Sequence, residues 1–269
     1  MRRLTGLLAA TTMTLAACGA GGGRITLPSD PDAVVLQIHS EGGFAPIEQT
    51  LSWGPTYTLL ADGRLIFPGA VIEIYPGPLL ANTQIITITE EQMDEILGLI
   101  EQVGLPDMVD EHDDSAGSNV ADATTEVFTF WDADRAPHIY SVYALGFQPD
   151  PIQATEAAIE LVDALSTASF SGVSEEYVSD RVQVIAGVSG IVPDPGFEDI
   201  RPWPLEGEDP GEWAEIEPGF KCKVFGPETI ELFRSATQLT QWLHPDPMMD
   251  APAYFLAVRP LHPGEPGCS

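Results

Sequence analysis

Short apolar runs bounded by turn residues alternate with amphipathic segments along this chain, a pattern typical of an α+β protein. The apolar runs that predict strands lie at 34–39, 57–61, 64–67, 124–131, 138–145, 182–186, 222–225 and 254–258. Asp62 and Gly63 separate the second run from the third. Because Asp-Gly accommodates the positive φ values of a type I′ turn, these two runs predict a β-hairpin.

The clearest helix signal follows Thr89, whose hydroxyl is placed to cap a helix with Gln92 three residues later, the spacing of a capping box. Apolar residues recur at helical spacing over 93–103, and Gly104 and Pro106 then end the pattern. The sequence therefore predicts a helix from about residue 90 to residue 103.

Two further helices are predicted from their first residues. Asp150 and Pro151 indicate a second helix, with the aspartate as N-cap and the proline in the first turn. Pro227 indicates a third helix, in the second half of the chain.

Strand pairs followed by helices predict two small domains, each a mostly antiparallel sheet with helices packed on one face. The Gly- and Ser-containing stretch 166–174 is the expected boundary, which gives an N-terminal α+β domain at 34–170 and a C-terminal one at 171–269.

The N-terminus has the features of an export signal. Arg2 and Arg3 precede an uncharged, apolar run that ends in Leu15-Ala16-Ala17-Cys18. This order resembles the signal peptide and lipobox of bacterial lipoproteins. The resemblance implies that residues 1–17 are a signal peptide, cleaved before Cys18, and that Cys18 is the lipid-attachment residue. The alternative is an ordinary secretory signal that leaves Cys18 as a free thiol.

A lipidated Cys18 implies a location on the outer face of the cytoplasmic membrane, with the membrane as a partner through the anchor. Two acyl chains hold a protein stably on a bilayer, whereas one holds it marginally. The glycine-rich and polar stretch 18–33 is then expected to be a flexible tether.

If Cys18 carries lipid, the other two cysteines of the chain, Cys222 and Cys268, form a pair. Export permits a disulfide, which would fasten the last residues onto the second half of the chain. The alternatives are a redox pair, which the absence of Cys-x-x-Cys disfavours, and a zinc site.

The chain has 41 acidic and 11 basic residues, a formal net charge of −30. Such a charge excludes nucleic acid as a partner, because a phosphate backbone needs a basic face. The acidic residues are spread along the sequence, which favours a role in solubility over the steering of a basic partner.

Motifs that identify a reaction are missing from the sequence. It contains no Gly-x-Ser-x-Gly, no His-Glu-x-x-His and no Walker loop, so we predict no catalytic residue, no cofactor and no metal site. The acidic segment 107–122 fits either a solvated loop or a calcium-binding loop, and the solvated loop is favoured. His112 and His138 are candidates for a zinc or copper site, but a hydrogen-bonded structural role is favoured. His262 lies in a Pro-rich loop without ligand spacing.

Several weak motifs together resemble uncharacterised cell-envelope lipoproteins of high-GC Gram-positive bacteria. They lie at 41–44, 62–63, 74–78, 120–123, 143–145 and 258–261. The resemblance implies no activity, so it transfers no catalytic residue to this chain.

These observations favour an exported, lipid-anchored envelope protein with a non-catalytic binding or scaffolding role. The alternatives are a hydrolase whose site assembles only in three dimensions and a solute-binding lipoprotein of a transporter. A hydrolase requires a deep pocket with convergent polar groups. A solute-binding lipoprotein normally requires repeated strand–helix alternation in two hinged lobes.

Overall fold

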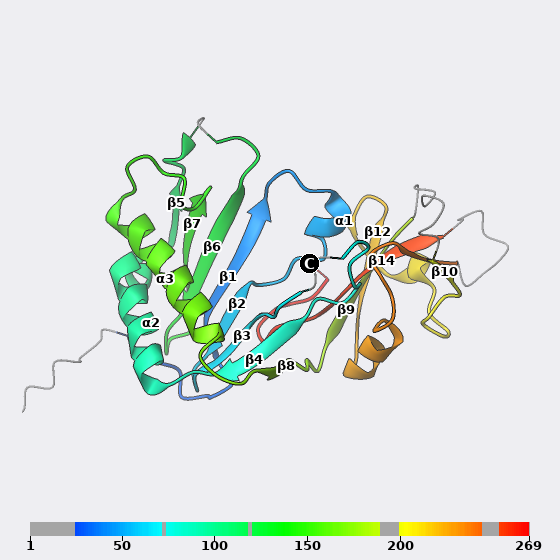
Figure 1. Cartoon of the computed structure of the whole chain (residues 1–269), viewed down its shortest axis with the longest axis horizontal. Helices are drawn as coiled ribbons and strands as arrows, with labels where there is room; N and C mark the ends of the chain where they lie inside the picture. The colour runs from blue at the N-terminus through cyan, green and yellow to red at the C-terminus, as the bar shows by residue number, and fades with distance from the viewer. Residues whose placement is uncertain (1–24, 72–73, 118–119, 189–198, 244–252, 269) are drawn as a thin grey trace, which may run out of the picture.

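Two mostly antiparallel sheets form the α+β fold in the computed structural model, which describes residues 25–71, 74–117, 120–188, 199–243 and 253–268 (Figure 1). The first sheet contains, in spatial order, β5 (Asp110–Asp113), β7 (Pro137–Tyr143), β6 (Thr124–Trp131), β1 (Val34–Gly42), β2 (Tyr57–Leu60), β3 (Arg64–Pro68), β4 (Thr83–Thr87) and β8 (Glu175–Glu176). The second sheet contains β10 (Asp199–Arg201), β13 (Thr240–Trp242), β14 (Tyr254–Pro260), β9 (Val182–Val188), β12 (Phe220–Phe225) and β11 (Ala214–Glu217). The predicted fold class is therefore confirmed.

Helices α2 (Glu90–Val103) and α3 (Gln153–Ser169) pack against each other and cover one face of the first sheet (Figure 1). Shorter helical segments are α1 (Ile47–Thr50), η1 (Leu105–Asp107), η3 (Pro210–Glu212) and η4 (Pro227–Leu232). The core beneath α2 and α3 is made of fully buried aliphatic and aromatic side chains, among them Ile38, Phe128, Phe130, Ile100 and Leu161. Each such side chain contributes about 1.5–3 kcal/mol to folding through burial.

The ends of α2 agree with the prediction. The Thr89 hydroxyl accepts a hydrogen bond from the Gln92 backbone N–H, and the Gln92 side chain accepts one from the Thr89 backbone N–H. At the other end Gly104 has a φ of 88°, the left-handed conformation that ends a helix most easily at glycine.

The start of α3 differs from the prediction. Its N-cap is Ile152, which is extended and makes no side-chain capping bond, so Asp150 is not the cap. The helix starts two residues later than a cap at Asp150 requires. A carboxylate from β5, described below, faces this end of α3 instead.

Two other predictions need correction. The segment that begins at Pro227 forms the short 3₁₀ helix η4 and not an α-helix. Part of the predicted acidic loop 107–122 is strand β5, which pairs in parallel with β7. Strand β5 has the sequence Asp-Glu-His-Asp, which contains no apolar residue. It therefore lacks the alternation of apolar and polar residues from which a strand is predicted.

In the second sheet, β9 is the central strand and nearly all of it is buried. Alternate residues of a strand face opposite sides. Val182, Val184 and Ala186 accordingly face one apolar cluster. Ile185 belongs to a smaller cluster with Cys222.

The edge strands of both sheets carry charged side chains, and three of the four are acidic. Among the described strands, β5, β8, β10 and β11 form the edges, and their sequences are Asp-Glu-His-Asp, Glu-Glu, Asp-Ile-Arg and Ala-Glu-Ile-Glu. Charged side chains on an edge prevent another strand from adding to it. Part of the large acid excess therefore acts to keep the sheets from associating edge to edge.

The last residues, 261–268, connect the two sheets, and we call them the C-terminal tail. Toward the first sheet, Pro263 O accepts a hydrogen bond from Gln37 Nε2 at 3.0 Å, and His262 Nδ1 lies 2.8 Å from Thr58 Oγ1. On the other side, Leu261 O accepts one at 2.6 Å from Ser179 Oγ, in the segment that leads into β9 of the second sheet. The chain end consequently lies between the sheets in Figure 1.

The described part of the predicted tether also contacts the first sheet. Ile25 and Leu27 pack against its core, and the Ile25 N–H donates to Glu101 Oε1 at 3.2 Å. The predicted boundary near residue 170 falls at the end of α3, but β8 still belongs to the first sheet. Across the described residues, no helix has the length and apolar character needed to span a bilayer.

Candidate functional site

A cleft of about 540 Å³ lies between the two sheets. Its walls come from β1, β3, β4 and β6 and the loop 52–56 on one side, and from β14, the C-terminal tail and Gln238 on the other. The volume falls within the range of small-molecule sites, and such sites often lie between structural units. This cleft is therefore the candidate functional site.

Although the protein as a whole is strongly acidic, the described lining of the cleft contains no acidic residue. Of the described residues that line it, none is Asp or Glu. Its one guanidinium belongs to Arg259, whose Nη1 forms an ion pair with Glu265 Oε1 at 2.8 Å; both side chains are largely buried. The charge of Arg259 is thus balanced from behind the cleft wall. The Nε of Arg259 is buried and has no hydrogen-bond partner among the described residues.

The imidazole of His262 is the most perturbed titratable group near the cleft. Only 4% of the residue is exposed, and its ring meets the Tyr177 ring edge-on at 5.4 Å. Burial, with the nearby positive charge of Arg259, lowers the pKa of His262 to about 3. The ring is therefore neutral at pH 7. Its hydrogen-bond partner Thr58 is itself completely buried, so this His–hydroxyl pair presents no nucleophile to a substrate.

Part of the cleft lining is apolar. Trp53 is 37% exposed, and Pro55, Pro68 and Val71 also line the site. The hydroxyl and amide groups of Thr56, Thr83 and Gln238 add polar lining, and none of these three side chains has a hydrogen-bond partner among the described residues. An exposed indole beside uncommitted hydroxyl and amide groups is typical of a site for an uncharged polar ligand.

A second hollow lies at the predicted acidic segment, between β5 and the start of α3. Its lining includes the carboxylates of Asp107, Glu111, Asp113 and Asp114. His112 Nδ1 lies 2.8 Å from Ser141 Oγ, because the parallel register of β5 and β7 places these two residues opposite each other. Ser141 is not among the residues that line this hollow, and the neighbours His112 and Asp113 on β5 direct their side chains to opposite faces of the sheet.

Asp113 is the carboxylate that faces the first turn of α3. It accepts hydrogen bonds from the Thr155 hydroxyl and from the Ser115 N–H. Burial alone would raise the pKa of Asp113, but the hydrogen bonds from Ser115 and Thr155 outweigh it and lower the pKa below its usual value. A negative charge near this uncapped helix start is favourable.

We expect Asp113→Asn to lower the free energy of unfolding by about 2 kcal/mol at pH 7, since it removes a buried charge that accepts two hydrogen bonds. The carboxylate with a lowered pKa stabilises the fold above its unfolded pKa, and this stabilisation is lost as the pH falls through the folded value. The difference between variant and wild type should therefore shrink below a pH of about 4. Urea unfolding at several pH values measures it, with the exposed neighbour Asp114→Asn as control. An equal loss in both variants would contradict the assignment.

The predicted metal candidates do not come together. His138 Nδ1 donates to Met108 O at 2.8 Å, whereas His112 contacts Ser141. Within the described ranges, no three His, Cys, Asp or Glu side chains form a group able to hold a metal ion. Residues 118 and 119 of the acidic segment lie outside the described residues.

The sulfur atoms of Cys222 and Cys268 lie 2.03 Å apart, the length of a disulfide bond. Cys222 is on β12, so the bond fastens the C-terminal tail to the second sheet. The predicted lipid-attachment residue Cys18, with the whole of 1–17, lies outside the described residues.

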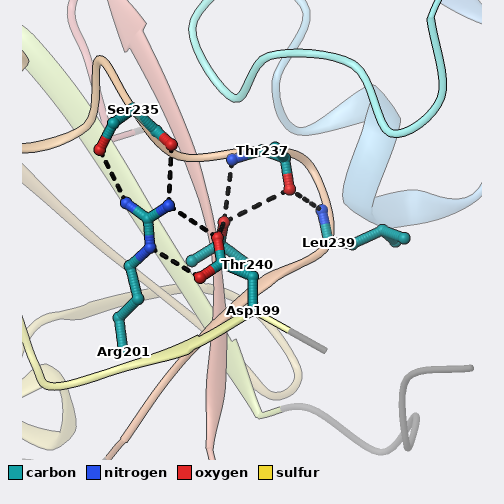
Figure 2. A network of polar contacts seen from close by, with 6 residues as sticks. All are labelled: Asp199, Arg201, Ser235, Thr237, Leu239 and Thr240. Atoms are coloured by element: carbon teal, nitrogen blue, oxygen red, sulfur yellow. Dashed lines mark hydrogen bonds and ion pairs between the residues drawn. The ribbon is translucent and has the colours of Figure 1, made fainter. Parts of the chain in front are cut away.

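A polar network at the far edge of the second sheet fixes β10 to β13 (Figure 2). Asp199 Oδ1 and Oδ2 accept from Arg201 Nε and Nη2, both at 2.8 Å, and Oδ2 also accepts from Thr240 Oγ1 at 2.7 Å. Arg201 also donates to Ser235 Oγ and O. The guanidinium pair lowers the pKa of Asp199. Because these groups satisfy one another, the network is a structural fastening of a three-residue edge strand.

Sequence reasoning did not find the cleft or single out His262. Comparison with protein-family models, with curated proteins and with solved structures finds no match for this chain.

Proposed function

We propose that this protein is exported, anchored to the outer face of the cytoplasmic membrane through lipid on Cys18, and non-catalytic, and that it binds a ligand in the cleft between its two sheets. The observation that supports binding is the cleft itself, with its exposed Trp53 and its uncommitted hydroxyl and amide groups. The resemblance of the N-terminus to a lipoprotein signal supports the anchor.

The two His–hydroxyl pairs described above favour binding over hydrolysis. Thr58 is buried away from solvent, and Ser141 is not among the residues that line the cleft or the second hollow. The C-terminal tail also makes hydrogen bonds toward both sheets, which restrains the hinge motion that a transporter's solute-binding protein uses.

Metabolic labelling with a palmitate analogue in a bacterial host tests the anchor. The wild-type protein should incorporate label, and Cys18→Ala should not. Label on neither protein would overturn the anchor and support free secretion.

Ligand-observed NMR on the full chain, exported and purified in detergent, tests binding. The panel contains maltotriose, mannotriose, triacetylchitotriose, a capped trialanine, trilysine and inorganic phosphate. At least one compound should bind, and Ala81→Trp should abolish that binding by filling the cleft from an exposed lining position. The same change at Ala136, an exposed residue outside the cleft, is the control. Binding of no compound, or equal binding in both variants, would overturn the proposed site.

A further inference from the structure

The charge balance of the cleft restricts the class of ligand. No carboxylate is found among its described lining residues, so a cationic ligand has no counter-charge there. Arg259 is already paired with Glu265 at 2.8 Å, so an anionic ligand would compete with a buried ion pair. Breaking such a pair leaves an uncompensated buried charge. The remaining class is a ligand without net charge.

The polar groups of the cleft restrict the class of ligand further. Thr56, Thr83 and Gln238 bring hydroxyl and amide groups that both donate and accept hydrogen bonds. A ligand that uses all of them must offer donors and acceptors close together, as vicinal hydroxyl groups do. A purely apolar ligand would leave these groups desolvated and unpaired.

The exposed indole of Trp53 adds an apolar surface to the polar groups of the cleft. A sugar ring has one face of C–H groups and an equator of hydroxyl groups, so it can lie on an aromatic ring while its hydroxyls reach neighbouring amides. Trp53 stands on one wall, and Gln238 comes from the other side of the same cleft.

An uncharged peptide is the nearest competitor. Extended peptides commonly bind by adding to a free strand edge, where the main chain supplies the hydrogen bonds. The described lining contains no residue of the edge strands β5, β8, β10 or β11. The cleft therefore offers side-chain hydroxyls and amides and not an edge.

We infer that the ligand is a neutral oligosaccharide, held by Trp53 against one sugar face and by Gln238, Thr56 and Thr83 at its hydroxyl groups. This inference rests on the proposed binding function and names the ligand class for the same cleft.

The panel titration described above separates the two proposals. We expect at least one of the three neutral oligosaccharides to bind, and Trp53→Ala to weaken its affinity by about twofold to tenfold, the scale of one aromatic contact. Gln238→Ala should weaken it as well. Because Trp53 and Gln238 are exposed, neither change removes core packing, and circular dichroism confirms the fold. Phe147→Ala, which removes an exposed aromatic ring outside the cleft, is the matched control and should leave the affinity unchanged.

Two results would overturn the oligosaccharide assignment. One is binding of the capped peptide, trilysine or phosphate alone, blocked by Ala81→Trp, which would leave the binding function standing. The other is oligosaccharide binding that Trp53→Ala and Phe147→Ala affect equally.

Discussion

Replacing both Cys222 and Cys268 by alanine should lower the free energy of unfolding by about 4 kcal/mol. The two residues are separated by 46 positions, and in the chain-entropy model a closed loop of this size restricts the unfolded chain by about that amount. Cys222 is also 1% exposed in a small apolar cluster with Ile185 and Ala257, so the substitution removes packing as well. Urea unfolding followed by circular dichroism measures the loss.

The matched control uses no substitution. Wild-type protein in excess dithiothreitol should also show a lowered urea midpoint, but by less than the double variant, because reduction removes the bond and leaves both side chains in place. The intact mass of the oxidised protein should be two protons lower than that of the reduced protein. Identical masses would show that the disulfide does not form. Identical midpoints with and without reductant would show that the disulfide does not stabilise the folded chain.

Local signals explain why some elements were predictable. The capping residues Thr89 and Gln92 and the C-terminal Gly104 lie within a few positions of the helix they bound, so α2 could be predicted closely. The hairpin of β2 and β3 was predictable in the same way from Asp62-Gly63, but of these two residues only Gly63 has a positive φ, of 84°, so the turn is not the predicted type I′.

Elements that depend on distant partners could not be predicted. Strand β10 has three residues and pairs in parallel with β13, whose residues are about forty positions later in the chain. Its fastening, the Asp199–Arg201–Thr240 network, is equally non-local. Short strands whose partners lie far along the sequence leave no periodic pattern to detect.

The cleft combines residues as distant as Trp53 and Arg259, so sequence spacing contains no trace of it. One local signal for His262 did exist. It follows the apolar run of β14 directly, through Leu261, and a residue that continues a buried strand has a raised chance of being buried.

Burial of His262 should make the protein measurably less stable in mild acid. The folded pKa of about 3 lies well below the usual value of 6.5, so the unfolded chain binds a proton that the folded chain does not. The stabilisation from the neutral ring is complete above the unfolded pKa and is lost as the pH falls toward the folded pKa. Between pH 7 and pH 5 we expect a loss of about 2 kcal/mol from this one residue.

The groups around the His262 ring agree with a lowered pKa. Arg259 repels a protonated imidazole, Thr58 and Tyr177 are uncharged at these pH values, and Glu265 is committed to Arg259 and to the His262 N–H. The carboxylates with lowered pKa, Asp113, Asp199 and Glu215, titrate at lower pH and contribute little in this window.

His262→Asn tests the prediction, because the asparagine side chain places a polar atom near the position of Nδ1 and can keep the bond to Thr58. Urea unfolding at pH 7, 6 and 5 should show a shallower loss of stability for the variant than for wild type. His39→Asn, which changes a partly exposed histidine of β1 outside the C-terminal tail, is the matched control. Equal slopes for wild type and His262→Asn would rule out His262 as the source.

The disulfide and the histidine should be coupled, because the same C-terminal tail carries both. The tail is fastened at Cys268, and His262 is buried only while the tail lies between the sheets. Without the bond, His262 can take up a proton in folded molecules whose tail has detached. The loss of unfolding free energy between pH 7 and pH 5 should therefore be smaller. The effects of Cys268→Ala and His262→Asn at pH 5 should therefore not add. Strict additivity would mean that the tail stays in place without its disulfide, and that contacts such as Gln37 with Pro263 are sufficient to hold it.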